Sequence, residues 1–229
     1  MDKRKNYYLV LDVEGVGKCN NALAYDLGFA ITDKKGNIYE KHSYVIREIF
    51  EEQKELMKSA YYANKIPNYI QDISTGKRQV VDFKLARWIL INTMKKWNVV
   101  AVCAYNAKYD RNALNNTLQF VTNGERKYFF PYGTEIYDIW TMCVETICKQ
   151  KTYHKLAKEN NWLTEKGFIG SKAEQVYRYV TGDYDFEEEH TGLEDVLIEA
   201  QLMAKAFSLH KKMNKCIKNN CWRLCQQVG

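Results

Sequence analysis

The 229-residue sequence has few of the residues that divide a chain into separate flexible parts. It contains only two prolines, Pro67 and Pro131, and no stretch rich in glycine and serine, so an interdomain linker is not expected. No apolar run approaches the roughly 20 residues of a membrane helix, and no signal-peptide core precedes the first apolar segment. These absences predict a soluble, cytoplasmic protein that has no membrane partner.

Paired Cys-x-x-Cys motifs are also absent, although the chain has seven cysteines. Without a secretion signal, these cysteines are expected to be reduced thiols and not disulfides. The spacing of Cys216, Cys221 and Cys225 lacks the paired form of structural zinc sites. Cys221 and Cys225 would lie on one face of a helix. We therefore predict a main domain over residues 1–209 and a basic, helical C-terminal tail, residues 210–229, that packs on it.

The composition is that of an ordinary globular protein, with 46% hydrophobic and 27% charged residues. The formal net charge of +6 fits a polyanionic partner, which a basic surface attracts over long distances. A surface that is merely rich in lysine gives the same total, so the charge alone does not separate the two interpretations.

The order of the apolar segments predicts a mixed sheet flanked by helices. Strands are expected at Tyr7–Val13, Tyr25–Thr32 and Ile38–Ile46, and the polar turn between the last two favours an antiparallel hairpin. The segment Val99–Tyr105 is apolar on both faces, which is typical of a central buried strand. A short edge strand is expected near Tyr132–Ile136.

Helical patterns surround the central and edge strands. Helices are expected at residues 83–97, 111–120, 139–148, 153–160 and 171–180, and a last long helix carries the apolar stripe from Leu193 to Phe207. Hairpin strands followed by a buried strand between helices predict an α/β fold with helices on both faces of the sheet.

The first strand ends in two acids, Asp12 and Glu14. Side chains along a strand alternate between its faces, so these two project on the same side, roughly 7 Å apart. Carboxylates placed in this way repel each other unless a cation lies between them, and a hard divalent cation prefers oxygen ligands. A solvated strand end is the alternative, and residues further along the chain decide between the two.

The central strand is followed by Asn106, whose side chain is expected to cap the next helix. Asp110 lies four residues later, in the first helical turn, and faces the same way. In isolation, an acid at this position is explained by the helix dipole.

A third polar group begins the last long helix. Thr191 and Glu194 have the spacing of a capping box, which predicts that the helix starts at Thr191. His190 then stands on a loop that is free to reach into a cleft, although a surface histidine is the alternative. Asp195 lies where the apolar stripe meets the sheet, and a carboxylate buried there needs a partner.

The three groups follow a fixed order along the chain, Asp12-x-Glu14, Asn106-x-x-x-Asp110 and His190-x-x-x-x-Asp195. In this order they resemble the motifs of the DEDDh family of 3′–5′ exonucleases. That family includes the proofreading subunits of bacterial replicative polymerases and the oligoribonucleases. The resemblance extends from Tyr7 to about Phe207 and implies a ribonuclease H-like fold for the main domain, which would be the exonuclease domain.

The resemblance also implies the parts of an active site. Two Mg²⁺ or Mn²⁺ ions would be held by four carboxylates, those of Asp12, Glu14, Asp110 and Asp195. His190 would be the general base, and the neighbouring carboxylates are expected to raise its pKa above the ordinary value of about 6.5. The implied reaction releases nucleoside 5′-monophosphates from the 3′ end of single-stranded nucleic acid, with DNA slightly favoured.

The chain departs from the family at two places. The family usually has a hydroxyl residue after the Asp-x-Glu motif, where it helps to hold the terminal nucleotide, whereas Gly15 and Val16 follow the motif here. We expect Gly15, Val16 and Asn106 to contact the substrate. The segment Arg47–Trp97 is longer than compact members need. Aromatic and basic residues of this segment could stack on a single strand and follow it, and the alternative is that they belong to the helix surface and the core. They are Tyr61, Tyr62, Lys65, Tyr69, Lys77 and Arg78.

The sequence allows other interpretations besides the nuclease. The run from Gly15 to Lys18 follows a strand, but it lacks the spacer and the hydroxyl of a phosphate-binding loop. An exoribonuclease that degrades RNA in the manner of an oligoribonuclease stays open, as does a binding module that has lost catalysis. The complete set of four acids and a histidine favours an enzyme. No polymerase or helicase segment is present, so a role in replication would need a separate partner.

Overall fold

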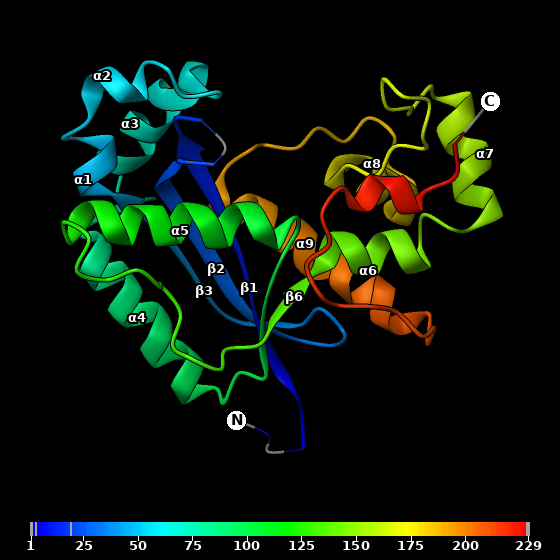
Figure 1. The fold of residues 1–229 in the computed structure, drawn as a ribbon, viewed down its shortest axis with the longest axis horizontal. Helices are drawn as coiled ribbons and strands as arrows, with labels where there is room; N and C mark the ends of the chain where they lie inside the picture. Colours follow the sequence, from blue (N-terminus) through cyan, green and yellow to red (C-terminus); the bar gives the residue numbers. More distant parts are fainter. Residues whose placement is uncertain (1, 3, 19, 228–229) are drawn as a thin grey trace.

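The computed structural model describes residues 2, 4–18 and 20–227. Its centre is a six-stranded sheet with the strand order β4-β3-β2-β1-β5-β6 (Figure 1). The strands are β1 (Tyr7–Val16), β2 (Leu23–Asp33), β3 (Ile38–Ile46), β4 (Gln79–Val81), β5 (Ala101–Ala104) and β6 (Ile136–Asp138). The pairs β1–β2 and β2–β3 are antiparallel, and β3–β4, β1–β5 and β5–β6 are parallel. The predicted mixed sheet is therefore confirmed, with β5 shorter than expected.

Helices cover both faces of this sheet (Figure 1). One face is covered by α1 (Arg47–Phe50), α2 (Lys54–Met57), α3 (Ile66–Ser74), α4 (Phe83–Lys96) and α5 (Ala107–Val121), with a 3₁₀ turn η1 (Ala63–Lys65) before α3. The other is covered by α6 (Ile139–Thr146), α7 (Lys151–Glu159), α8 (Ala173–Thr181) and α9 (Gly192–Ser208). The segment that carries α1 to α3 has more helical structure than the sequence patterns indicated.

The alternation of β1 assigns its acids to one face. The odd-numbered side chains from Tyr7 to Val13 belong to the core under α4 and α5. Tyr8 and Val10 belong to the core under α6 and α9. Because Asp12 and Glu14 continue the even-numbered series, they point toward the face that α9 covers.

Residues 210–227 contain one short helical element, the 3₁₀ turn η2 (Cys221–Leu224), in place of the longer helix expected there. Cys221 and Cys225 are both buried, and Cys216 is exposed. The six cysteines within the described ranges are free thiols, and Cys19 lies outside them. None of the described helices is long and apolar enough to span a membrane.

Candidate active site

The end of β1 brings the first two candidate acids under α9. The Oδ2 atom of Asp12 is buried and has no hydrogen-bond partner among the described residues. Glu14 is 9% exposed. The pairing register with β2 shifts between Glu14 and Gly15, which ends the regular ladder beside the two acids.

Helix α5 places Asp110 against the same strand. The backbone N–H of Val13 donates to Asp110 Oδ1 at 3.2 Å, while Oδ2 is buried and finds no partner in the described part of the chain. The start of α5 is held by Asp138, whose carboxylate accepts from the N–H groups of Ala107 (3.2 Å) and Thr141 (3.3 Å). Asp138 therefore joins the first turns of α5 and α6 and fixes the position of Asp110.

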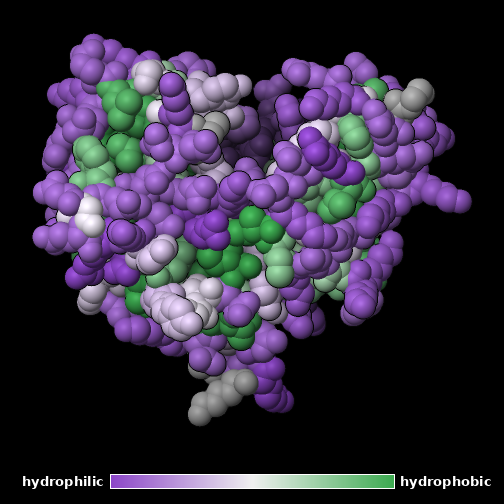
Figure 2. Space-filling model, in the orientation of Figure 1, coloured by the Kyte–Doolittle hydropathy of each residue, from purple (hydrophilic) through white to green (hydrophobic). Residues whose placement is uncertain are grey.

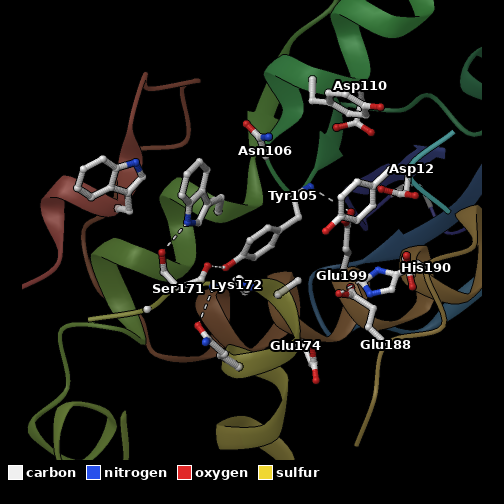
Figure 3. Close-up of a pocket in the computed structure, with 18 of the residues that line it drawn as sticks. Asp12, Tyr105, Asn106, Asp110, Ser171, Lys172, Glu174, Glu188, His190 and Glu199 are labelled. Carbon is white, nitrogen blue, oxygen red and sulfur yellow. Dashed lines mark hydrogen bonds and ion pairs between the residues drawn. The ribbon is translucent and has the colours of Figure 1, made fainter. Parts of the chain in front are cut away.

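Asn106 does not cap α5 as predicted. It adopts the left-handed conformation, with φ at 65°, and its side chain makes no capping bond. The prediction was wrong because Asp138, from another strand, supplies the acceptor for the first turn of α5. The exposed side chain of Asn106 lines the cleft in front of the acids instead (Figure 3).

Two glycines let α9 rest directly on the sheet. Gly28 pairs with Asp12 in the neighbouring strand, and a Cβ atom on Gly28 would lie 2.2 Å from the carbonyl carbon of Gly192. A Cβ atom on Gly192 would lie 2.7 Å from the backbone nitrogen of Gly28. Real side chains do not approach this closely, so both positions need glycine. The contact sets the first turn of α9, and with it Asp195, above Asp12.

The capping box at this helix is only partly formed. Helix α9 begins after Thr191, as predicted, but the Thr191 hydroxyl donates to the Glu194 carboxylate at 2.6 Å and makes no bond to the backbone. The N–H of Gly192 donates to Asp26 at 3.0 Å, and the Tyr69 hydroxyl donates to the same carboxylate at 2.6 Å. A buried acid on β2 and a side chain from α3 thus support the start of α9.

Three of the candidate strand-tracking residues have structural contacts. Tyr69 and Arg78 are buried, at 2% and 5% exposure, and Lys77 pairs with Asp72 at 3.3 Å. The Arg78 guanidinium lies within ion-pair distance of three carboxylates, those of Asp26 (3.4 Å), Asp72 (3.0 Å) and Glu194 (3.0 Å). Tyr69 and Arg78 therefore join the segment with α1 to α3 to β2 and α9 as core residues, and Lys77 lies on the surface.

Burial raises the pKa of all four candidate acids, and the charges of nearby carboxylates add to the rise. Burial is the largest cause in each case, and it raises the pKa of Glu14 to about 10, of Asp195 to about 9 and of Asp110 to about 8. The pKa of Asp12 is also raised well above its ordinary value, by burial and by the charge of Asp110. Buried carboxylates that repel one another need a cation or protons.

The donor set fits a hard divalent cation. Oxygen atoms of Asp12, Asp110 and Asp195 are buried without hydrogen-bond partners in the described residues, so they are available as ligands. Within the same part of the chain, one group of three side chains brings ligand atoms within 4.8 Å of one another, and it consists of Glu14, His190 and Asp195. Glu14 and Asp195 therefore come close to His190, and Asp12 and Asp110 line the same cleft.

A fifth acid, Glu199, was not predicted from the sequence. It lies one turn after Asp195 on α9, is 3% exposed, and accepts a hydrogen bond from the N–H of Tyr105 at 3.1 Å. Burial and the charges of Asp12 and Asp110 raise its pKa well above the ordinary value. The spacing of four residues from Asp195 was the available signal, because it places both acids on one helix face.

The His190 side chain reaches into the cleft beside Glu188 (Figure 3). Its backbone is left-handed, with φ at 51°, and its ring stacks on Tyr62 with centroids 4.4 Å apart. Lys65 donates to the backbone carbonyl of Glu189, so the segment before α3 also holds the loop. The expected rise in the pKa of His190 is wrong: burial of the ring lowers the pKa, and the positive charges of Lys65 and Lys172 add to the effect.

The acids line a cleft of about 1090 Å³, seen as a hollow between the parts that carry α1 to α3 and α7 to α8 (Figure 2). Gly15 lines it, and a Cβ atom there would lie 2.4 Å from the Tyr109 hydroxyl, so that hydroxyl fills the space of a side chain. Val16 is 1% exposed and does not line the cleft, because its side chain packs in the core. Tyr61 and Tyr62 line one wall.

No family model and no curated protein matches the sequence. The fold is similar to that of E. coli Exonuclease I. Its complex with a 5cy-dT13 oligonucleotide has a TM-score of 0.53 at 12% identity, over 86% of this chain and 40% of that chain. Its complex with dT13 has a TM-score of 0.51 at 11% identity, over 90% and 42%. The zinc-bound form of its single-stranded DNA complex has a TM-score of 0.51 at 11% identity, over 89% of this chain and 42% of that chain.

The chain thus spans less than half the length of the Exonuclease I chains. At this level of identity the likeness concerns the fold. It confirms the ribonuclease H-like fold that the order of the sequence motifs implied.

Proposed function

We propose that this chain is a metal-dependent 3′–5′ exonuclease that hydrolyses single-stranded nucleic acid to nucleoside 5′-monophosphates. The observation that carries the proposal is the convergence of carboxylate oxygens without hydrogen-bond partners from β1, α5 and α9 at one end of a cleft. Acids that raise one another's pKa destabilise a fold unless they serve a ligand. The open cleft beside them has room for a nucleic-acid terminus.

The candidate residues would have two roles, metal binding and proton transfer. Asp12, Glu14, Asp110 and Asp195 would hold two Mg²⁺ or Mn²⁺ ions, which when bound supply Lewis acidity for the phosphate and the attacking water. His190 would take the proton of that water. A lowered pKa keeps its imidazole neutral at pH 7, which is the form that a general base requires.

Several features around His190 keep it in position. Tyr62 stacks against the ring, and Glu188 Oε2 lies 3.7 Å from its Nδ1 atom.

Gly15 and Asn106 line the cleft and are the two predicted substrate contacts that remain. Val16 can contact the substrate only through its backbone, because its side chain is buried in the core.

DNA is the substrate that we propose first, because the structures with a similar fold were obtained with oligo-dT and with single-stranded DNA. RNA remains the alternative, since the 2′-hydroxyl contacts that separate the two sugars are not evident from the fold. An inactive binding module is less well supported, because it has no use for three acids whose buried oxygens lack hydrogen-bond partners among the described residues. A replication partner for this chain also remains a proposal.

The test is digestion of 5′-labelled DNA and RNA oligonucleotides in Mg²⁺, in Mn²⁺ and in EDTA. We expect a ladder that shortens from the 3′ end in either metal and no digestion in EDTA. A blunt duplex should be digested more slowly than a single strand, because its terminal pairs must open before the end enters the cleft. Digestion that persists in EDTA, or that starts at the 5′ end, would refute the proposal.

A further inference from the structure

The C-terminal strap, which we define as residues 213–227, runs from the end of α9 past β6 and α6 (Figure 1). The N–H of Asp138 donates to the carbonyl of Lys215 at 2.7 Å, which joins the strap to the outer strand of the sheet. Glu145 on α6 accepts from the N–H of Asn214 at 2.8 Å and pairs with Lys218 at 2.6 Å. The strap is therefore attached to the body along its first part.

Buried contacts on both sides hold the middle of the strap, where Trp222 lies. Cys221 is 1% exposed, and its thiol lies 3.4 Å from the Thr141 hydroxyl. Cys225 is 5% exposed, and the N–H of Ile169 donates to the carbonyl of Gln226 at 2.9 Å. Trp222 thus stands between two fixed points and is not part of a free tail.

Trp222 faces the same cleft as the acids. It lines that cleft together with Trp140 and Tyr105, and Trp140 is fixed by a hydrogen bond from its indole N–H to the Ser171 hydroxyl at 2.8 Å. The Tyr105 hydroxyl donates to the backbone carbonyl of Ser171, which is labelled in Figure 3. Lys166 Nζ lies 5.7 Å from the centre of the Trp222 ring. One wall of the cleft is therefore aromatic and carries a cation.

The cleft continues beyond this wall. A second cavity of about 410 Å³ shares Asn106, Trp140 and Trp222 with the cleft and extends to Lys108 and to residues 218–220. Lys108 donates to the side chain of Asn219 at 2.8 Å, so α5 and the strap meet there. A groove thus leads from the acids, over the two tryptophans, to a surface with basic side chains.

We propose that the strap binds the nucleotides that lie 5′ of the terminal one, with bases stacked on Trp222 and Trp140. This inference rests on the proposed function, because it takes the acid end of the cleft as the place of the 3′ terminus. Aromatic side chains beside cations bind single strands without sequence preference, since every base has a stacking face. The strap would therefore favour long substrates over short ones and would discriminate little between base sequences.

The test compares Trp222→Ala with Trp88→Ala, which removes an exposed tryptophan on α4 away from the cleft. Binding of a labelled trinucleotide and of a dT oligonucleotide of about twelve residues is measured by fluorescence anisotropy in EDTA, where no hydrolysis is expected. Trp222→Ala should weaken binding of the long oligonucleotide about tenfold and weaken binding of the trinucleotide less, since the longer strand places more bases on the strap. Trp88→Ala should change neither.

Two further variants separate stacking from loss of the strap. Trp222→Phe keeps a stacking ring and should retain most of the affinity, and Lys166→Ala removes a cation without touching the buried contacts of the strap. Equal weakening of both ligands by Trp222→Ala, or none, would overturn the inference. If the proposed function itself is wrong, wild-type protein digests neither length in Mg²⁺. If only the strap is misassigned, wild type and Trp222→Ala digest both lengths alike.

Discussion

Carboxylates at the two ends of the sheet have opposite surroundings. At the end where β2 turns into β3, Asp33 accepts hydrogen bonds from the N–H of Lys35 and the hydroxyl of Tyr39, both at 2.8 Å. At the other end, buried oxygens of Asp12 and Asp110 have no such donors in the described residues. Asp33 on β2 is therefore a satisfied acid at one end of the sheet, whereas Asp12 on β1 and Asp110 on α5 have oxygens at the other end without partners among the described residues.

The pKa values follow this difference. Burial raises the pKa of Asp33, but hydrogen bonds from Asn37 and Tyr39 outweigh it and hold the pKa well below the ordinary value. Burial raises the pKa of Asp12, and the charge of Asp110 raises it further. An ionised carboxylate with donors stabilises the fold, whereas one without them costs stability until a cation arrives. The surroundings of Asp33 therefore fit a role in stability, and those of Asp12 and Asp110 fit the metal site that we propose.

The largest effect is expected from exchanging each acid for its amide. Asp12→Asn should lower the rate by on the order of 10³-fold or more, because one of the proposed metal ligands is lost. Without metal its stability should be unchanged or higher, since a repelling charge is gone. Asp33→Asn is the matched variant, and it should keep full activity while losing about 1–3 kcal/mol of unfolding free energy. Oligonucleotide digestion and urea unfolding of both variants measure the two effects.

The comparison fails if the two variants behave alike. Near-full Mg²⁺-dependent activity in Asp12→Asn would remove this acid from the metal site. A loss of stability in Asp12→Asn as large as that in Asp33→Asn would show that both ends serve the fold.

Substitution of His190 tests whether the acids suffice for the proposed hydrolysis or a general base is also needed. His190→Ala should lower the rate about 10²–10⁴-fold, as expected for loss of a general base, while Mg²⁺ binding is largely kept. Titration calorimetry with Mg²⁺ and single-turnover digestion measure the two quantities. Tyr62→Ala is the companion variant, because it removes the ring that stacks on His190 and should cause a smaller loss of rate. Wild-type turnover in His190→Ala would make the histidine a bystander.

Gly28→Ala tests whether the close contact between Gly28 and Gly192 is needed to position Asp195. The added methyl group would lie 2.2 Å from a backbone atom of Gly192, so α9 must move away from β2. We expect a loss of about 1–3 kcal/mol in unfolding free energy, typical of overpacking, together with reduced activity. Lys41→Ala, at an exposed position of the adjacent strand, should change neither. Unchanged activity in Gly28→Ala would show that the placement of Asp195 tolerates displacement of the helix.

The smallest effect concerns pH at the satisfied end. Glu40 accepts hydrogen bonds from Lys96 at 2.6 Å and from Trp97 at 2.7 Å, and pairs with His42 at 3.0 Å. Burial raises the pKa of Glu40, but these partners outweigh it and lower the pKa to about 2. Because the folded-state pKa is depressed, the stabilisation is complete above the unfolded-state pKa of about 4.3 and is lost as pH falls toward 2.

Glu40→Gln should therefore cost about 1 kcal/mol at pH 7, and the difference from wild type should shrink between pH 5 and the acid limit. Urea unfolding at several pH values measures it, with Glu125→Gln at an exposed site as the control. A difference that stays constant with pH would mean that the charge of Glu40 contributes nothing.

The sequence predicted those parts of the molecule that depend on local pattern. The alternation along Tyr7–Val16 put Asp12 and Glu14 on one face, and the helical stripe after Thr191 placed Asp195 toward the sheet. Hairpin, central strand and flanking helices follow from the same periodicities. These patterns sufficed for the mixed sheet between helices, whereas the ribonuclease H-like fold and the set of acids were implied by the resemblance to the exonuclease family.

Contacts between distant segments explain what was missed. Asn106 does not cap α5, because Asp138 from a later strand does so. The pKa of His190 falls because the burial of the ring and the charge of Lys65 outweigh the charge of Glu174, and neither is visible from the residues next to it. The tail that was expected to be a helix is instead held through contacts with α6 and β6, which spacing alone does not reveal.

The hydrogen bond from Gly192 to Asp26 joins residues 166 positions apart in the chain. Closing so long a loop is slow compared with forming a hairpin, so β1 to β3 can assemble well before α9 docks. During synthesis, when N-terminal segments fold first, the acids of β1 would wait without Asp195 until nearly the whole domain has emerged. Catalytic competence would then appear in one late step, and a nascent or truncated chain would be harmless to the nucleic acids around it.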